Sequence, residues 1–495
     1  MLRLFPLALC CLLLLNVTVL PAASQAKFDP DARSSVAASQ KPAGSGLPFG
    51  KVIDAVPCVA DHTQTYALYV PSTYTATKMW PIIYVFDPEG RGRVSVDLYR
   101  EVVEKYGFIL AASNNSRNFQ NESTANAART LWDDTHVRFN LDPHRVYTMG
   151  FSGGARVATA LAVRCEPCAI AGVIAHGAGY PFPPSTKEHF VYFAFIGSQD
   201  FNWPEIMELR RLKEDSSSAY RLKVFAGGHQ WAPASIFNEA LDWVQVKAMQ
   251  SGTIPRDASF IERVFAYTEK EARDAHDNHD AITEFDAYRS LVSDFGGFKD
   301  VSELQTKLDA FKNSSEFKQG MKKQQNAIDQ QRTLTQDISS DISRIADADS
   351  DSRLSLRNAI ADGMNSLKRR ADRAKTEDER LIFTRAFNEV WVQGMEAGQA
   401  ELEQGRHFAS AELYFQLMAA VTPEEPWPHL LLAETAVARG DKKQANKELR
   451  EAVKRGLKNP DTLDEDVNLQ SLRGDAEFQR LVAELKEKRD SQPAD

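Results

Sequence analysis

The residues best suited to chemistry lie in the segment Gly150-Phe-Ser-Gly-Gly154, which places Ser152 in the spacing G-x-S-x-G. β-forming residues precede this segment from Arg145, and small, helix-compatible residues follow it to Val163. A strand, a sharp turn and a helix in that order hold a serine in a strained backbone conformation with its hydroxyl pushed outward. The segment therefore predicts that Ser152 is a nucleophile and that the amide of Gly153 faces a developing oxyanion.

A serine hydroxyl needs a base, and in this arrangement the acid and the base follow the serine along the chain, each after a strand. Asp200 follows the apolar strand candidate 190–196, and Glu205 is the competing acid. His229 follows a later strand candidate, after two glycines that free the backbone. We therefore predict that Ser152 attacks an acyl carbonyl, that His229 accepts its proton, and that Asp200 orients the imidazole.

Three further residues complete the predicted site. The second oxyanion donor is expected in the loop after Phe86, and because Pro88 has no N–H, Glu89 is predicted to donate. Trp203 and Trp231 flank the predicted acid and base. These two side chains are candidates either for lining an apolar substrate pocket or for packing in the core.

The elements that must position these residues alternate between strand and helix from about Gln64 to Met249. Apolar or alternating runs predict strands at 64–70, 80–86, 107–112, 169–175, 190–196 and 221–225, together with the one that leads into Gly150. Helices are predicted at 94–106, 124–139 and 235–249. This rhythm predicts an α/β domain over 49–252, with a doubly wound, mostly parallel sheet and helices on both faces.

After about Gly252 the strand signals vanish and the periodicity becomes helical. Between 391 and 485, small residues and turn glycines recur at the spacing of a tetratricopeptide helix pair. We divide this part into a helical region at 253–385 with a possible degenerate repeat, and tetratricopeptide-like repeats at 386–490. Such arrays bind peptides or partner proteins, so a protein or peptide partner is expected there. A plain helical bundle is the alternative.

The N-terminus has the pattern of a signal peptide at 1–26, followed by a flexible leader at 27–48. We expect an exported protein, periplasmic or secreted, with no stable membrane span once the signal is cleaved. Cys58, Cys165 and Cys168 then remain, and we expect one disulfide and one thiol, without being able to assign the pair. The net charge of −9 is spread over mixed signs, which argues against nucleic acid as a partner.

The segment from Gln64 to Ser235 resembles the exported α/β-hydrolase esterases related to polyhydroxybutyrate depolymerases, feruloyl and acetylxylan esterases, and dienelactone hydrolases. The resemblance rests on the stretch Asp142-Pro-His-Arg-Val-Tyr-Thr-Met-Gly-Phe-Ser-Gly-Gly154 and on Gly227-Gly-His-Gln-Trp231. It implies hydrolysis of a small-molecule ester with neither a metal nor an organic cofactor. Many relatives carry a His-Gly pair where this chain has Asp87-Pro88, which leaves the oxyanion hole and the substrate open.

Two other functions stay open at this point. One is a serine peptidase with the same triad, and the other is a binding or scaffold protein whose hydrolase-like core serves the helical repeats. The sequence identifies neither the ester substrate nor the oligomeric state. Because every predicted site residue precedes Gly252, we expect residues 27–252 to fold and cleave small esters by themselves, unless the helices cover the site.

Overall fold

The computed structural model describes residues 46–490 except 166–167, 186–187, 215–217 and 465. The predicted signal peptide and nearly all of the predicted leader therefore lie outside the described residues. Within the described part, eight strands form one sheet in the order β1-β2-β4-β3-β5-β6-β7-β8. The strands are β1 Val52–Pro57, β2 Thr65–Tyr69, β3 Trp80–Phe86, β4 Ile109–Ser113, β5 Leu141–Phe151, β6 Gly172–His176, β7 Val191–Gly197 and β8 Tyr220–Phe225.

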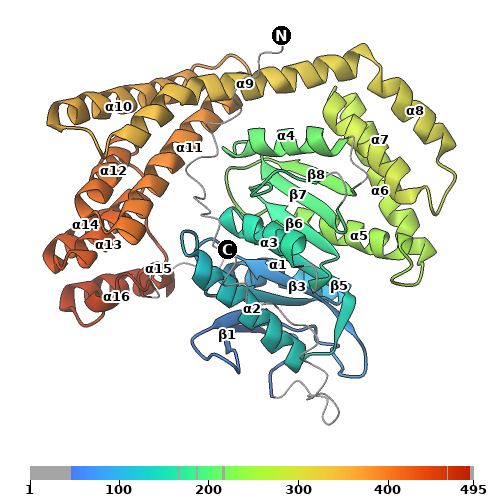
Figure 1. Cartoon of the computed structure of the whole chain (residues 1–495), viewed down its shortest axis with the longest axis horizontal. Helices are drawn as coiled ribbons and strands as arrows, with labels where there is room; N and C mark the ends of the chain where they lie inside the picture. The colour runs from blue at the N-terminus through green and yellow to red at the C-terminus, as the bar shows by residue number, and fades with distance from the viewer. Residues whose placement is uncertain (1–45, 166–167, 186–187, 215–217, 465, 491–495) are drawn as a thin grey trace, which may run out of the picture. The chain divides into compact units, whose positions relative to one another are not determined.

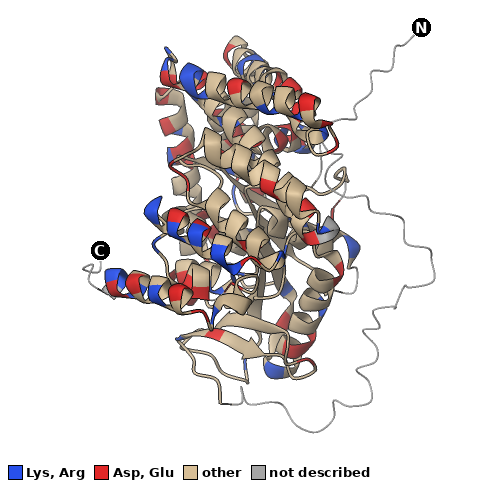
Figure 2. Cartoon of the chain, turned by 90° about the vertical axis from the view of Figure 1, so that its left-hand side faces the viewer, with Lys and Arg blue, Asp and Glu red and all other residues tan. Residues whose placement is uncertain are grey.

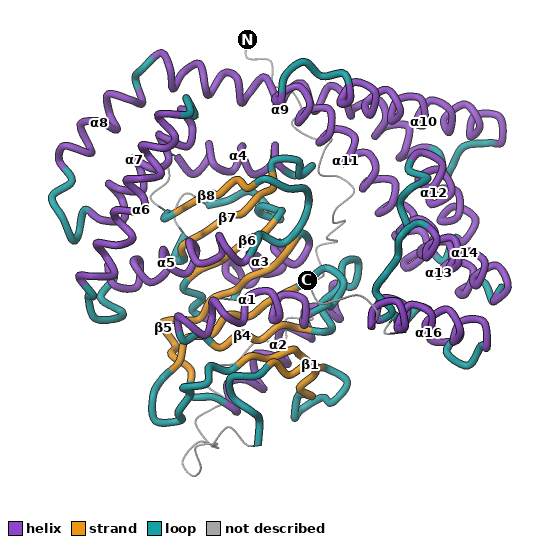
Figure 3. Tube along the Cα trace, turned by 180° about the vertical axis from the view of Figure 1, so that it is seen from behind, coloured by secondary structure: helices purple, strands orange, loops and turns teal. Residues whose placement is uncertain are grey.

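Strand β2 pairs antiparallel with both β1 and β4. All the other neighbouring strands of the sheet, from β4 through β3 to β8, pair in parallel. Parallel neighbours need crossover connections. Helices supply four of these connections, and a fifth helix follows the last strand. These helices are α1 Gly92–Tyr106, α2 Asn121–Arg138, α3 Gly153–Arg164, α4 Trp203–Glu214 and α5 Ala234–Gln250. The strand order and the helical crossovers are those of the α/β-hydrolase fold, so the predicted fold class of this domain is confirmed (Figure 3).

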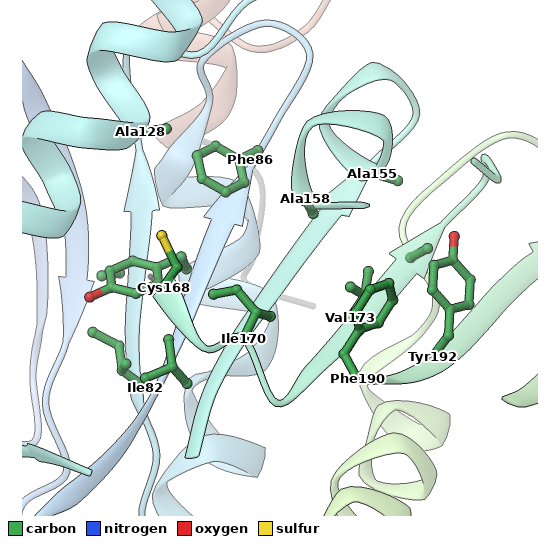
Figure 4. Close-up of a cluster of buried hydrophobic side chains, with 14 of the residues drawn as sticks. Ile82, Phe86, Ala128, Ala155, Ala158, Cys168, Ile170, Val173, Phe190 and Tyr192 are labelled. Atoms are coloured by element: carbon green, nitrogen blue, oxygen red, sulfur yellow. The ribbon is translucent and has the colours of Figure 1, made fainter. Parts of the chain in front are cut away.

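The sheet is covered on both faces because successive side chains of a strand point in opposite directions. In β3, Ile82 and Phe86 join the cluster that contains buried residues of α2, α3 and α4, as Figure 4 shows for part of that cluster. Ile83 and Val85 join the opposite cluster, with residues of α1 and α5. Each large apolar side chain buried in this way stabilises the fold by about 1.5–3 kcal/mol.

Sequence patterning missed the edge strand β1. Only Val56 of its six residues is buried, and its register with β2 shifts between Ile53 and Val56. A short edge strand with a bulge leaves little periodic signal, because most of its side chains face water.

The described residues from 253 to 490 form helices and short connections, as predicted. The helices are α6 Ala258–Asp277, α7 Ala281–Phe295, α8 Ser302–Lys312, α9 Ser315–Arg344, α10 Ser350–Asp372, α11 Glu377–Ala400, α12 Phe408–Val421, α13 Trp427–Ala438, α14 Lys442–Lys454, α15 Asp461–Asp464 and α16 Ala476–Asp490, with a π-helix at Glu401–Gly405 and a 3₁₀-helix at Gln470–Leu472 (Figure 1). The predicted boundary between 385 and 386 falls inside α11. One continuous helix therefore joins the two predicted segments instead of separating them. Acidic and basic side chains are interspersed along these helices (Figure 2).

Small residues allow close approach within the C-terminal helices. A Cβ atom placed on Gly398 of α11 would lie 2.5 Å from the Phe415 ring of α12. Gly440 takes a φ of +86° between α13 and α14, where Asp441 caps α14 through the amide of Gln444. The turn and the close approach explain why glycine occupies these two positions.

The helices after α5 are not a detached module. Ile328 of α9 is buried within the cluster on one face of the sheet. Arg210 of α4 donates from Nε and Nη2 to the carboxylate of Asp286 in α7, at 2.7 and 3.0 Å. Trp243 of α5 donates to Asp294 of α7 at 3.0 Å. These contacts show that the later helices pack against the α/β domain, and the expectation that residues 27–252 fold by themselves stays a prediction.

Two further observations concern the cysteines and the hydrophobicity of the helices. Cys165 and Cys168 form a disulfide, and Cys58 is a buried free thiol. Among the helices that the structure describes, none is long and apolar enough to cross a membrane.

Candidate active site

The turn between β5 and α3 holds Ser152 in a strained conformation, with φ 52° and ψ −123°. The two flanking glycines are required by the tightness of the turn. A Cβ atom on Gly150 would lie 2.2 Å from the carbonyl of Gly154, and one on Gly154 would lie 2.0 Å from the carbonyl oxygen of Phe86. The Ser152 amide donates to the carbonyl of His176 at 2.8 Å, which ties the turn to the end of β6. The side chain of Ser152 remains partly accessible.

His229 and Asp200 meet across the loops that follow β8 and β7. The distance from Nδ1 of His229 to Oδ2 of Asp200 is 2.9 Å. Asp200 is fully buried, and this burial raises the pKa of its carboxyl, while the interaction with His229 and the amide of Asn202 act in the opposite direction. The imidazole lies between the rings of Phe151 and Phe201, with ring centroids 4.6 and 4.4 Å away. With Nδ1–H donated to the carboxylate, Nε2 is left as the proton acceptor.

Gly177 lies where the nucleophile turn, the acid and the base converge, and sequence reasoning missed it. It follows β6 with a φ of +69°. A Cβ atom there would lie 3.0 Å from the Phe151 ring, 3.1 Å from Cε1 of His229 and 3.2 Å from Oδ2 of Asp200. A side chain at this position would be strained by the positive φ and would crowd the acid and the base. The available sequence signal was the His-Gly pair directly after a predicted strand.

The loop after β3 does not offer the predicted donor. The Glu89 amide donates to Oδ1 of Asp87 at 2.9 Å, so it is already committed within the loop. Nε of Arg91 donates to the same oxygen at 3.0 Å, and Nε1 of Trp231 approaches Oδ2 at 3.4 Å. An aspartate side chain often accepts a hydrogen bond from the backbone N–H two residues later. Because Asp87 holds the Glu89 N–H in this way, that N–H is not free to bind an oxyanion, and the prediction of Glu89 as the second donor is corrected.

The amide of Gly153 opens α3, where first-turn amides have no intrahelical acceptor. Asn118 is a second residue at this point that the sequence did not single out. A Cβ atom placed on Gly153 would lie 1.8 Å from Oδ1 of Asn118. The backbone N–H of Asn118 donates to the carbonyl of Pro88 at 2.8 Å. Asn118 therefore joins the loop after β3 to the start of α3.

The two tryptophans have different surroundings. Trp231 is only 8% exposed and packs against Phe151 and His176, at ring centroid distances of 5.5 and 4.9 Å. This placement favours the packing alternative for Trp231. Trp203 is half-buried, and the guanidinium of Arg385 in α11 lies 4.1 Å from its ring centroid.

Glu205, the competing acid, is engaged elsewhere. Its two carboxylate oxygens accept from Nη1 and Nη2 of Arg156 at 2.7 and 2.8 Å. Its Oε1 also accepts from the amide of Gly179 at 3.2 Å. Within the described residues, the carboxylate that bonds to His229 is that of Asp200.

Comparison with known proteins gives structural neighbours only: no family model and no curated protein matches the sequence. The S-formylglutathione hydrolase FrmB of Staphylococcus aureus is similar at a TM-score of 0.33 with 12% identity, over 39% of this chain and 96% of that protein. The feruloyl esterase module of Clostridium thermocellum gives 0.31 and 12%, over 39% and 88%. An esterase from Pyrobaculum calidifontis gives 0.33 and 12%, over 41% and 85%. These neighbours are hydrolases and esterases by name, and the similarity is confined to under half of this chain.

The helical region also reaches the site. Burial raises the pKa of Glu396 in α11, and electrostatic interactions with Arg156 and with the imidazole of His229 lower it. A carboxyl group of α11 therefore lies within electrostatic range of the imidazole.

A second histidine near the site has a structural role. His176 is fully buried between aromatic rings, and burial lowers its pKa to about 3, so it is neutral at physiological pH. Its Nδ1 accepts from the amide of Ala232 at 3.3 Å.

Proposed function

We propose that this chain is a serine hydrolase that cleaves carboxylic esters through an acyl-enzyme on Ser152. One observation carries the proposal. Ser152 stands on a strained turn between strand and helix, and the hydrogen-bonded pair of His229 and Asp200 lies against the ring of the preceding residue, Phe151. A strained serine next to an oriented imidazole is the arrangement that activates a hydroxyl for acyl transfer.

In the first half of the reaction, Oγ of Ser152 bonds to the acyl carbon, its proton passes to Nε2 of His229, and the carbonyl electron pair moves onto oxygen. When this intermediate collapses, the bond to the alcohol breaks and the alcohol oxygen takes the proton from His229. Water repeats the sequence on the acyl-enzyme and releases the acid. Asp200 accepts the hydrogen bond from Nδ1 throughout and stabilises the imidazolium.

The oxyanion is stabilised by the amide of Gly153 at the start of α3, where the helix dipole also favours negative charge. In place of Glu89, Nδ2 of Asn118 is the second donor: it lies 3.1 Å from the position of a Cβ atom on Gly153, with Oδ1 of the same side chain nearer at 1.8 Å. Asn118→Ala is then expected to lower kcat by about 10²-fold. Glu89→Ala, which keeps its backbone amide engaged with Asp87, is the matched control and is expected to leave kcat near the wild-type value.

The remaining parts of the proposal concern the binding partner and the location of the protein. The pairs α11–α12 and α13–α14 act as tetratricopeptide-like repeats that hold a protein or peptide partner. The protein is exported, and the disulfide between Cys165 and Cys168 suits an oxidising compartment.

A fluorophosphonate probe tests the function directly. We expect the purified protein to be labelled, and Ser152→Ala to abolish both labelling and turnover while circular dichroism stays unchanged. A panel of acyl esters, aryl esters and peptides then separates an esterase from a peptidase. A folded wild-type protein that is neither labelled nor active on this panel would favour a scaffold role instead.

A further inference from the structure

The loop that carries Asp200 is held from two sides. Its amide groups face the loop of the base: the amide of Ser198 donates to the carbonyl of Phe225, and that of Gln199 donates to the carbonyl of Gly227, both at 2.8 Å. The backbone bond from Gln199 thus reaches a residue two positions before His229. Main-chain hydrogen bonds therefore hold the loop that carries Asp200 against the loop that carries His229.

The carbonyl groups of the same loop face the helical region. Nη1 of Arg385 in α11 donates to the carbonyl of Ser198 at 2.9 Å. Nδ2 of Asn388, one turn further along α11, donates to the carbonyl of Gln199 at 3.0 Å. Side chains almost 190 residues away in the chain thus complete the hydrogen bonding of the residues just before Asp200.

Helix α9 adds a third bond. Nε2 of Gln331 donates to the carbonyl of Phe201 at 3.1 Å and to Glu389 of α11 at 2.9 Å. Oε1 of the same glutamine accepts from Nε of Arg385 at 3.0 Å. One fully buried glutamine therefore links α9, α11 and the acid loop.

Arg385 is an unusual residue to find in this position. Its side chain is only 3% exposed, and among the described residues it forms no ion pair with a carboxylate, although the charge of Asp378 acts on it from farther away. Burial lowers its pKa to about 10. A buried cation without a carboxylate is costly unless its hydrogen bonds and ring contacts offset the lost hydration. Here those compensating contacts are the Ser198 carbonyl, Gln331 and the Trp203 ring.

We propose that Arg385 is a positioning residue, through which the helical region holds the acid loop so that the carboxylate of Asp200 faces His229. The inference rests on the proposed function. A shift of about 1 Å in a group that orients a catalytic base can cost about 100-fold in rate. The helices thus contribute to catalysis without supplying a reacting group.

The test compares two buried arginines of the full-length protein that both link the α/β domain to the later helices. Arg385→Met removes the bonds to the acid loop. Arg210→Met removes the bonds to Asp286 and leaves the acid loop untouched. Turnover of a soluble ester gives kcat and KM, and the downfield proton resonance of His229 Nδ1–H reports its hydrogen bond to Asp200.

We expect Arg385→Met to lower kcat by about 10- to 100-fold with little change in KM, and to shift or broaden the His229 resonance. Arg385→Lys should recover part of kcat, because an ammonium group retains the charge but only one of the fork contacts. Arg210→Met should lower the melting temperature while keeping kcat and the resonance near wild type.

An Arg385→Met protein with wild-type kcat and an unchanged resonance would overturn the inference. If that variant fails to fold, Asn388→Ala replaces it, with an expected loss of about fivefold in kcat; unchanged kcat and resonance would again overturn it. Failure of the proposed function is recognised separately, because the wild type would then not react with a fluorophosphonate, while the effect of Arg385→Met on the His229 resonance would persist.

Discussion

Hydrogen bonds reach both carboxylate oxygens of Asp200 in the protein interior. His229 donates to Oδ2 and the amide of Asn202 donates to Oδ1, each at 2.9 Å. These bonds oppose the burial that raises its pKa. Glu205, five residues further along, uses its oxygens to bind Arg156 instead. The two carboxylates therefore have separate roles, one with the base and one with a neighbouring cation.

This division predicts opposite results for two isosteric substitutions. Asp200→Asn should lower kcat by about 10³- to 10⁴-fold, because an amide favours the wrong imidazole tautomer and cannot stabilise the imidazolium. Glu205→Gln should keep kcat within about tenfold of wild type and mainly reduce stability. Steady-state kinetics on a simple ester, with thermal melts as the folding control, separate the two. A larger loss of kcat in Glu205→Gln than in Asp200→Asn would show that Glu205, not Asp200, is the acid that orients His229.

The contact between β3 and α3 sets how closely the nucleophile turn approaches the loop after β3. Gly154 lies so close to the carbonyl of Phe86 that no other side chain fits without a backbone shift. We expect Gly154→Ala to destabilise the fold by about 1–3 kcal/mol and to reduce turnover, since the shift moves the amide of Gly153. Gly474→Ala is the control: the space around Gly474 is open, so its effect should stay within about 0.5 kcal/mol. Urea denaturation measures both, and equal stabilities would contradict the close contact.

The buried carboxyl group of Glu434 in helix α13 is expected to make the stability of the fold depend on pH. Glu434 is 7% exposed, and burial together with the nearby Asp466 raises its pKa well above the ordinary value of 4.5. Asn468 donates to Oε2 of Glu434 at 2.6 Å. Because the folded chain binds this proton more tightly than the unfolded chain, the group stabilises the fold at acidic pH. That contribution is lost as the pH rises above the usual glutamate range.

Glu434→Gln removes the titration while keeping a side chain of the same shape. We expect the free energy of unfolding of the wild type to fall more steeply between pH 5 and pH 8 than that of the variant. Urea midpoints at the two pH values provide the measurement. Parallel pH dependences for the two proteins would show that Glu434 is not protonated in the folded state.

The α/β domain and the later helices share one structural framework. Ile328 lies in the core of the sheet, Asp286 and Asp294 bind side chains of α4 and α5, and Arg385 holds the acid loop. Cutting the chain after Gly252 would expose apolar surface, leave Arg210 without its carboxylate and free the loop of Asp200.

We therefore expect a protein ending at Gly252 to be aggregated or, if it folds, to lose at least about 10-fold in kcat on a small ester. Circular dichroism, size-exclusion chromatography and ester turnover measure these outcomes. A monomeric, folded truncation with wild-type kcat would show that the helices serve only partner binding.

The sequence alone determined the features that depend on local order along the chain. The glycine spacing around Ser152 predicted the strained turn, and the order of strand ends predicted which aspartate and histidine would approach each other. Alternation of buried strands and helices predicted the sheet, because a period of two or of 3.6 is a property of neighbouring residues.

Only the tertiary structure decided the features that depend on residues far apart. Trp231 packs against Phe151 and His176 and donates to Asp87, which decides between its two predicted roles. Gly177 becomes essential because three loops converge on it, and Arg385 matters because α11 packs beside the loop of Asp200. Hydrogen bonds and contacts between distant segments are set by how the elements pack, and no spacing within the chain records them.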